Sequence, residues 1–222
     1  MFDYFSSPMG WCETRMGDIF IYSSYIIEFW NSITSLFFCL SGIYGYYMHY
    51  NMKLDNVPWF YLFSIGITSA IFHATLSFIG QFLDELSIIL LITYCLRVYY
   101  KINYSIYIFL SFILSCISWF HPSVSLPILL VCGFLLILST YQSVNNNKDD
   151  YLWYNSMKIG ILAITSWLVD FICIINTHML WHILMSISSY YMILFVIKEN
   201  KRELVVKGYY LPYLEYRLKV IK

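Results

Sequence analysis

Residues 58–100 read PWFYLFSIGITSAIFHATLSFIGQFLDELSIILLITYCLRVYY and contain two apolar runs, 58–79 and 82–100. Each run is close to the roughly 20 residues that a helix needs to cross a bilayer. His73 lies near the end of the first run and Asp84 near the start of the second. An ionisable side chain in hydrocarbon costs roughly 2.5–3.5 kcal/mol or more, so such residues mark a functional site by default. This stretch therefore predicts two membrane helices that contribute residues to a functional site.

The rest of the chain has the same apolar character. Of its 222 residues, 60% are hydrophobic and only 12% are charged, which is more apolar surface than a soluble core of this size can bury. Polar or Gly/Pro breaks separate five further apolar segments, at 25–48, 104–120, 124–142, 153–174 and 177–197. We therefore predict an all-α membrane protein, a seven-transmembrane helix bundle. Its parts would be an N-terminal arm at 1–24, a catalytic domain at 25–197 and a basic tail at 198–222.

The distribution of basic residues predicts the orientation, because cytoplasmic loops hold the excess of Lys and Arg. If the N-terminus is lumenal or extracellular, only Arg15 of the 13 Lys and Arg residues lies on that side. The opening MFDYFSSPMGWCETRMGD lacks the basic start and apolar core of a cleavable signal peptide. We expect a lumenal or extracellular N-terminus, a cytosolic C-terminus, and a tail that lies on the anionic cytosolic leaflet.

The six cysteines divide into two groups. Four of them lie inside the apolar segments and are best explained as small apolar residues: Cys39, Cys95, Cys116 and Cys132. Cys12 and Cys173 both fall on the lumenal, oxidising side under the predicted topology, where a bridge between them is possible. Cysteine positions alone leave this pairing open.

Three histidines and Asp84 fall at one depth in the predicted bundle. His73 lies about 22 Å along its helix, within two turns of the lumenal end. His178 and His182 occupy the first two turns of the last helix, one turn apart on one face. Three neutral imidazoles with an exchangeable fourth position form the ligand set of a catalytic zinc ion. The sequence therefore predicts that His73, His178 and His182 bind zinc.

Two further polar residues have alternative roles at such a site. Asp84 is either a fourth ligand or a general base that takes a proton from the zinc-bound water and passes it to a leaving group; the second role fits better. Ser69 lies four residues before His73 on the same helix face, where it either bonds the water or an oxyanion, or bonds its own helix backbone. Glu85 points about 100° away from Asp84 and is expected to make another contact.

Taken together, these residues resemble the alkaline ceramidases, which belong to a wider superfamily of seven-helix zinc hydrolases that includes adiponectin-receptor-like proteins. The matching stretches are WCE at 11–13, EFWN at 28–31, Ser69-x-x-x-His73, LDEL at 83–86, and WHIL at 181–184 preceded by His178. The likeness covers nearly the whole chain in order and spacing.

The resemblance implies an activity and a role for each matching residue. His73, His178 and His182 match the zinc ligands, Asp84 and Ser69 match the residues that contact the zinc-bound water, and Cys12 and Cys173 match a lumenal disulfide. The implied reaction is hydrolysis of the ceramide amide to a sphingoid base and a fatty acid. The expected setting is the membrane of the endoplasmic reticulum or Golgi, with lipid and no nucleic acid as partner.

The N-terminal arm departs from the family pattern. Family members often bind calcium through an acidic D-W-x-E-x-N motif and a Glu at the start of the first helix, an oxygen-rich set that suits this ion. Trp11, Glu13 and Glu28 are retained here, but Gly10 replaces the Asp and Arg15 occupies the Asn position. Either Asp18 could restore an oxygen ligand, or Arg15 could replace the charge of a missing metal ion. The resemblance therefore implies a calcium site formed by Trp11, Glu13, Asp18 and Glu28.

A different functional class fits the same pattern. Seven helices with an outside N-terminus also describe an adiponectin-receptor-like receptor with a structural or weakly hydrolytic zinc site. Asp84 favours the hydrolase, because a purely structural zinc needs no carboxylate beside an exchangeable water. Asp170 lies near the same layer, where it either orients a ligand histidine or pairs with a neighbouring helix.

Overall fold

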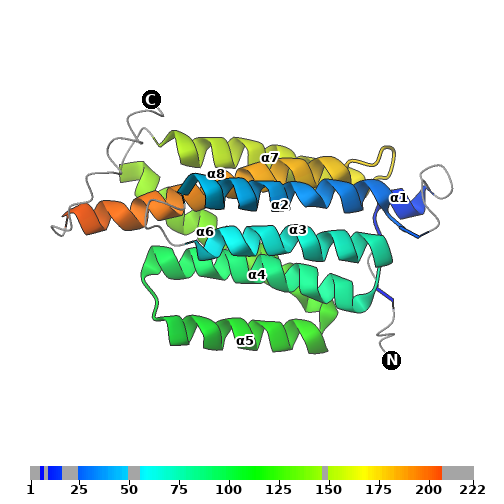
Figure 1. Ribbon diagram of the computed structural model, residues 1–222, viewed down its shortest axis with the longest axis horizontal. Coiled ribbons are helices and arrows are strands. Elements are labelled where there is room, and N and C mark those ends of the chain that lie inside the picture. The colour runs from blue at the N-terminus through cyan, green and yellow to red at the C-terminus, as the bar shows by residue number, and fades with distance from the viewer. Residues whose placement is uncertain (1–5, 8–9, 17–24, 50–55, 147–149, 207–222) are drawn as a thin grey trace.

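The computed structural model describes residues 6–7, 10–16, 25–49, 56–146 and 150–206. A short helix, α1 (Cys12–Arg15), precedes seven long ones: α2 (Phe29–His49), α3 (Val57–Thr75), α4 (Phe78–Tyr100), α5 (Tyr104–Phe120), α6 (Pro122–Asn146), α7 (Tyr151–Asp170) and α8 (His178–Val206). Figure 1 shows the long helices running alongside one another, with α1 at one end of the bundle. The prediction of an all-α fold is confirmed.

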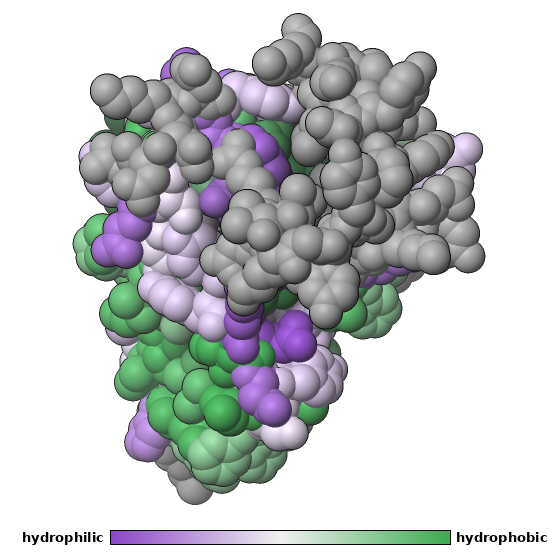
Figure 2. All heavy atoms as spheres, turned by 90° about the vertical axis from the view of Figure 1, so that its left-hand side faces the viewer, coloured by the Kyte–Doolittle hydropathy of each residue, from purple (hydrophilic) through white to green (hydrophobic). Residues whose placement is uncertain are grey.

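Four of the described helices are long and apolar enough to cross a membrane, namely α3, α4, the Pro122–Val144 part of α6 and the His178–Asn200 part of α8. Helix α5 is as apolar but only 17 residues long. Its large side chains face outward, with Phe109 62% and Phe112 65% exposed, and such a surface needs lipid around it. Figure 2 views the end opposite α1, where hydrophilic residues gather above an apolar flank.

The turn between α3 and α4 differs from the sequence expectation, which placed a break at Gly80 and Gln81. Leu76, in the left-handed conformation with φ 43°, ends α3, and the Ser77 hydroxyl accepts the Gly80 N–H at 3.1 Å to start α4. Gly80 serves packing instead, because a Cβ there would lie 2.9 Å from the Phe72 Cα of α3. The predicted break was therefore about one turn too late.

Helix α8 also runs further than the apolar segment 177–197 that predicted it. It continues to Val206, and the ammonium of Lys198 pairs with the buried carboxylate of Asp150 at 2.7 Å. The first residues of the expected basic tail therefore continue this helix.

Glycines allow α2 and α3 to pack closely. A Cβ on Gly66 would lie 2.6 Å from the Cys39 backbone nitrogen, and one on Gly45 would overlap the Trp59 indole. Small residues at such contacts let helix backbones approach within a membrane bundle. The core below them includes the fully buried Trp59, Leu62 and Phe195. This packing fixes α2 and α3 side by side, and both carry residues of the site described next.

We predict that Gly66→Ala lowers the stability of the protein by about 1–3 kcal/mol, because the added methyl group meets backbone that must shift. Gly133→Ala is the matched control: it also lies within a helix, but no atom lies within 4 Å of the place that its methyl group would take. This variant should be neutral or more stable by up to about 1 kcal/mol. Thermal unfolding in detergent measures both, and equal midpoints would contradict the packing role.

Candidate metal centre

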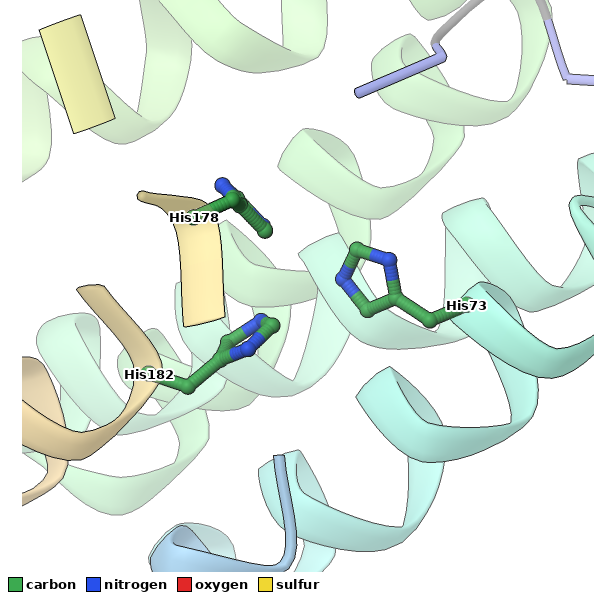
Figure 3. Close-up of side chains that lie close together, drawn as sticks. All are labelled: His73, His178 and His182. Carbon is green, nitrogen blue, oxygen red and sulfur yellow. The ribbon is translucent and has the colours of Figure 1, made fainter. Parts of the chain in front are cut away.

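Three buried histidines come together at the α1 end of the bundle. His73 lies in the last turn of α3, while His178 and His182 lie in the first two turns of α8. One nitrogen from each ring lies within 4.8 Å of the other two, and the ring centroids are 4.6 to 5.1 Å apart. Figure 3 shows the three rings around one shared space. The structure therefore brings together the three residues that the sequence predicted as ligands.

Hydrogen bonds fix two of these rings. The Nδ1 of His73 lies 2.6 Å from the Oε2 of Glu28, and the Nδ1 of His182 lies 3.1 Å from the Thr34 hydroxyl. An ionised carboxylate only accepts, so His73 donates from Nδ1 and keeps the lone pair of Nε2 for a metal. Such outer partners orient histidine ligands in metal sites.

The cluster fits a metal ion that prefers imidazole. All three rings are at most 2% exposed, and the Nδ1 of His178 has no hydrogen-bond partner among the described residues. One nitrogen from each buried ring lies near the other two, so the cluster offers three imidazole donors to a single ion. Neutral imidazoles suit zinc, copper, iron and nickel. This group could hold a metal ion with a coordination position left open.

Ser69 and Asp84 are linked to the histidine cluster through Ser35, whose hydroxyl lies 3.4 Å from the Nε2 of His182. Ser69 is 1% exposed, its hydroxyl is 3.0 Å from that of Ser35, and it also interacts with the Asp84 carboxyl group. Asp84 Oδ1 is buried and has no hydrogen-bond partner within the described chain. Ser69 thus contacts residues on neighbouring helices, as its place on the His73 face of α3 suggested. Glu85 turns elsewhere, as expected, and accepts a hydrogen bond from the Gln81 side chain at 2.8 Å.

The arm is tied to the bundle by a disulfide. Cys12 in α1 is bonded to Cys173 after α7, which confirms the predicted bridge. The guanidinium of Arg15 donates to the backbone carbonyls of Asp170 and Phe171 at 3.0 and 3.3 Å. These carbonyls end α7, where a positive charge is favourable. The described residues 12–15 of the arm are therefore fixed at the end of α7.

The Asp170 side chain bonds backbone N–H groups at the start of α8, in agreement with the alternative that it pairs with a neighbouring helix. Its Oδ1 accepts the N–H groups of Thr177 and His178, both at 3.0 Å, and its Oδ2 accepts that of Cys12 at 2.9 Å. A carboxylate in this position caps the start of α8. Asp170 thereby fixes the backbone of a candidate ligand instead of bonding its ring.

The expected calcium residues form a different kind of arrangement. Glu28 accepts from Trp11 N, Thr14 Oγ1, Asn31 Nδ2 and His73 Nδ1, which uses the roughly four lone-pair sites of a carboxylate. Glu13 accepts from the backbone N–H groups of Trp30 and Asn31 at 2.8 and 3.0 Å, and from the Asn176 amide.

These hydrogen bonds satisfy both carboxylates without a cation. Burial raises the pKa of the Glu13 carboxyl group above its ordinary value, an effect that the two backbone bonds oppose. As arranged, the carboxylates of Glu13 and Glu28 do not fit a calcium site, and the part of Trp11 in calcium binding stays a prediction. Asp18 lies outside the described residues, and its part stays a prediction.

The sequence reasoning missed the polar face of α2 and assigned Glu28 only to calcium. Glu28, Asn31, Thr34 and Ser35 are spaced three or four residues apart, so they share one helix face, and all point into the site. That spacing in an otherwise apolar segment is the signal that could have identified them.

Comparison with known proteins places the chain in a family. The family model described as Ceramidase matches residues 3–213. Alkaline ceramidase 1 of Homo sapiens is 30% identical over 220 residues, which cover 86% of this chain and 82% of that protein. The alkaline ceramidase of Drosophila melanogaster is 28% identical, covering 83% and 74%, and alkaline ceramidase 3 of Mus musculus is 26% identical, covering 86% and 82%. This chain therefore belongs to the alkaline ceramidase family.

Proposed function

We propose that this protein is an intramembrane zinc-dependent hydrolase that cleaves the amide bond of ceramide to give a sphingoid base and a fatty acid. The observation that carries the proposal is the buried cluster of His73, His178 and His182 beside Ser69 and Asp84, in a chain of the alkaline ceramidase family. The names of the relatives support the reaction, and the apolar helices support a lipid substrate.

His73, His178 and His182 would hold the zinc ion. When bound, zinc supplies a Lewis acid that polarises the amide carbonyl and lowers the pKa of a water molecule towards 7. The three imidazoles stay neutral in this role, which suits their burial in an apolar bundle. Glu28 and Thr34 keep the rings of His73 and His182 oriented.

Asp84 is the proposed general base and acid. Its buried Oδ1 is free to accept a proton from the attacking water and to return it to the amine nitrogen as the amide bond breaks. Ser69 lies between Ser35 and Asp84, where its hydroxyl can hold the carboxylate or donate to the carbonyl oxygen as negative charge develops there.

We also propose that all seven long helices cross the membrane, with the site and N-terminus on the lumenal or extracellular side and the C-terminus in the cytosol. Helix α2 packs on α3 and α8, and α7 packs on α8, so both lie within the bundle of apolar helices. The Cys12–Cys173 disulfide at the α1 end suits an oxidising compartment. The membrane of the endoplasmic reticulum or Golgi is the proposed location, with residues 1–24 as arm, 25–197 as catalytic domain and 198–222 as cytosolic tail.

We expect purified protein to contain roughly one zinc ion per chain, and His178→Ala to lose most of it, because two imidazoles hold zinc much more weakly than three. Elemental analysis measures the metal. His121→Ala is the control, since His121 is an exposed residue at the end of α5. Zinc content that is the same in both variants would refute the ligand assignment.

Asp84→Asn should lower hydrolysis by roughly 10²–10⁴-fold, the usual contribution of a general acid–base group, while zinc stays bound. Mass spectrometry of the released fatty acid and sphingoid base measures the rate. Glu85→Gln should change it little, because Glu85 bonds Gln81. Loss of zinc together with activity would make Asp84 a ligand, and zinc binding without any hydrolysis by the wild type would favour the receptor alternative.

Because hydrogen-bond donors already satisfy Glu13 and Glu28, we expect hydrolysis to be independent of calcium. The measurement is the wild-type rate in a calcium-free assay with buffered free zinc, before and after calcium is added. A several-fold increase that Glu13→Gln abolishes would instead establish a calcium site at the arm.

A further inference from the structure

We propose that Trp11 is a positioning residue of the metal centre, whose indole holds the ring of His178 in the orientation that coordination requires. The inference rests on the proposed zinc site and adds a residue to it. The resemblance implies a calcium site that includes Trp11, whereas the contact between its indole and His178 points to a role at the histidine cluster.

The three histidines are supported unequally. His73 and His182 each have a hydrogen bond from Nδ1, to Glu28 and Thr34 respectively. His178 Nδ1 has no such partner among the residues that the structure describes. A histidine ligand normally has an outer partner that fixes its tautomer and ring orientation. Another contact must restrain His178.

Trp11 provides that contact from the arm. Its ring centroid lies 3.8 Å from that of His178, with an angle of 16° between the planes, the closest and most parallel of the ring contacts that His178 makes. The Trp181 indole, one helical turn further along α8, lies 5.1 Å away at 17°. Stacking against a flat, buried indole prevents the imidazole from tilting out of this plane.

The stack should also strengthen when a metal binds. An imidazole that donates its lone pair to a cation becomes more positive, and the face of an indole attracts positive charge. Trp11 would therefore stabilise the coordinated ring more than the free one. This is a direct contribution to metal affinity, separate from any effect on the stability of the fold.

Trp11 is itself firmly held. Its N–H donates to Glu28 Oε1 at 3.1 Å, the same carboxylate that bonds His73, and the next residue forms the disulfide with Cys173. The indole packs at an angle on Trp167 and Phe171. One carboxylate and one disulfide therefore fix the plane against which His178 lies.

Trp11 is 7% exposed, and its Nε1 is buried without a hydrogen-bond partner within the described chain. Leaving a buried donor unpaired costs stability. Ring contacts, and no side-chain hydrogen bond within the described residues, therefore hold the indole in place.

The test compares zinc release from purified, zinc-loaded wild type, Trp11→Leu and Trp11→Phe, followed with a chromogenic chelator. Trp11→Leu should release zinc roughly 10- to 100-fold faster, the range for loss of an outer partner of a metal ligand. Trp11→Phe keeps an aromatic face and should restore most of the wild-type rate. In cobalt-substituted protein, Trp11→Leu should change the visible spectrum and Trp11→Phe should not.

Trp167→Leu is the matched control. The Trp167 indole packs on Trp11, but among the described residues it makes no ring contact with His178. An intact Cys12–Cys173 disulfide, checked by thiol labelling, shows that the arm is still docked. If Trp11→Leu does not fold, Trp11→Met takes its place. Equal release from the Trp11 and Trp167 variants overturns the positioning role. Wild type without bound zinc overturns the proposed function instead.

Discussion

The structure depends on one buried carboxylate, that of Glu28, at the start of α2. It is fully buried, and it bonds the arm through Trp11 and Thr14, its own helix through Asn31, and α3 through His73. A charge buried in an apolar bundle must be paired or it destabilises the fold strongly. The arm, α2 and α3 can therefore reach low energy only when all of these partners meet at one point. The position of His73 follows from that requirement.

Two other buried carboxylates, at the starts of α2 and α8, are also satisfied by several hydrogen bonds. Glu13 caps the start of α2 through the N–H groups of Trp30 and Asn31, and Asp170 caps the start of α8 through those of Thr177 and His178. Glu13 also bonds Asn176, and Asp170 also bonds Cys12. The same two carboxylates therefore cap helices and join distant parts of the chain at this end of the bundle. Functional groups on such fixed elements hold their geometry better than groups on loops.

The sides of the bundle are apolar and the candidate site at its end is polar, which explains how a lipid substrate could reach polar reactive groups. The outward faces of α5 and α6 carry exposed side chains such as Phe109 and Phe134, which lipid can solvate. The polar residues of the candidate site lie instead inside the α1 end, where backbone N–H groups and carboxylates satisfy one another. A hydrolase built this way keeps its reactive groups out of the hydrocarbon while its substrate stays in the membrane.

The sequence by itself determined the apolar class, the approximate helices, the one-face spacing of His178 and His182, and the family motifs, because hydropathy and helical periodicity are local properties. Only the tertiary structure decided what the buried polar groups contact. Glu28 meets His73 across 45 residues, and Asp170 meets Cys12 across 158. It also decided that Gly80 packs against Phe72 instead of ending a helix, and that Trp11 stacks on His178. These contacts depend on which helices lie side by side, and that is set by packing over the whole bundle.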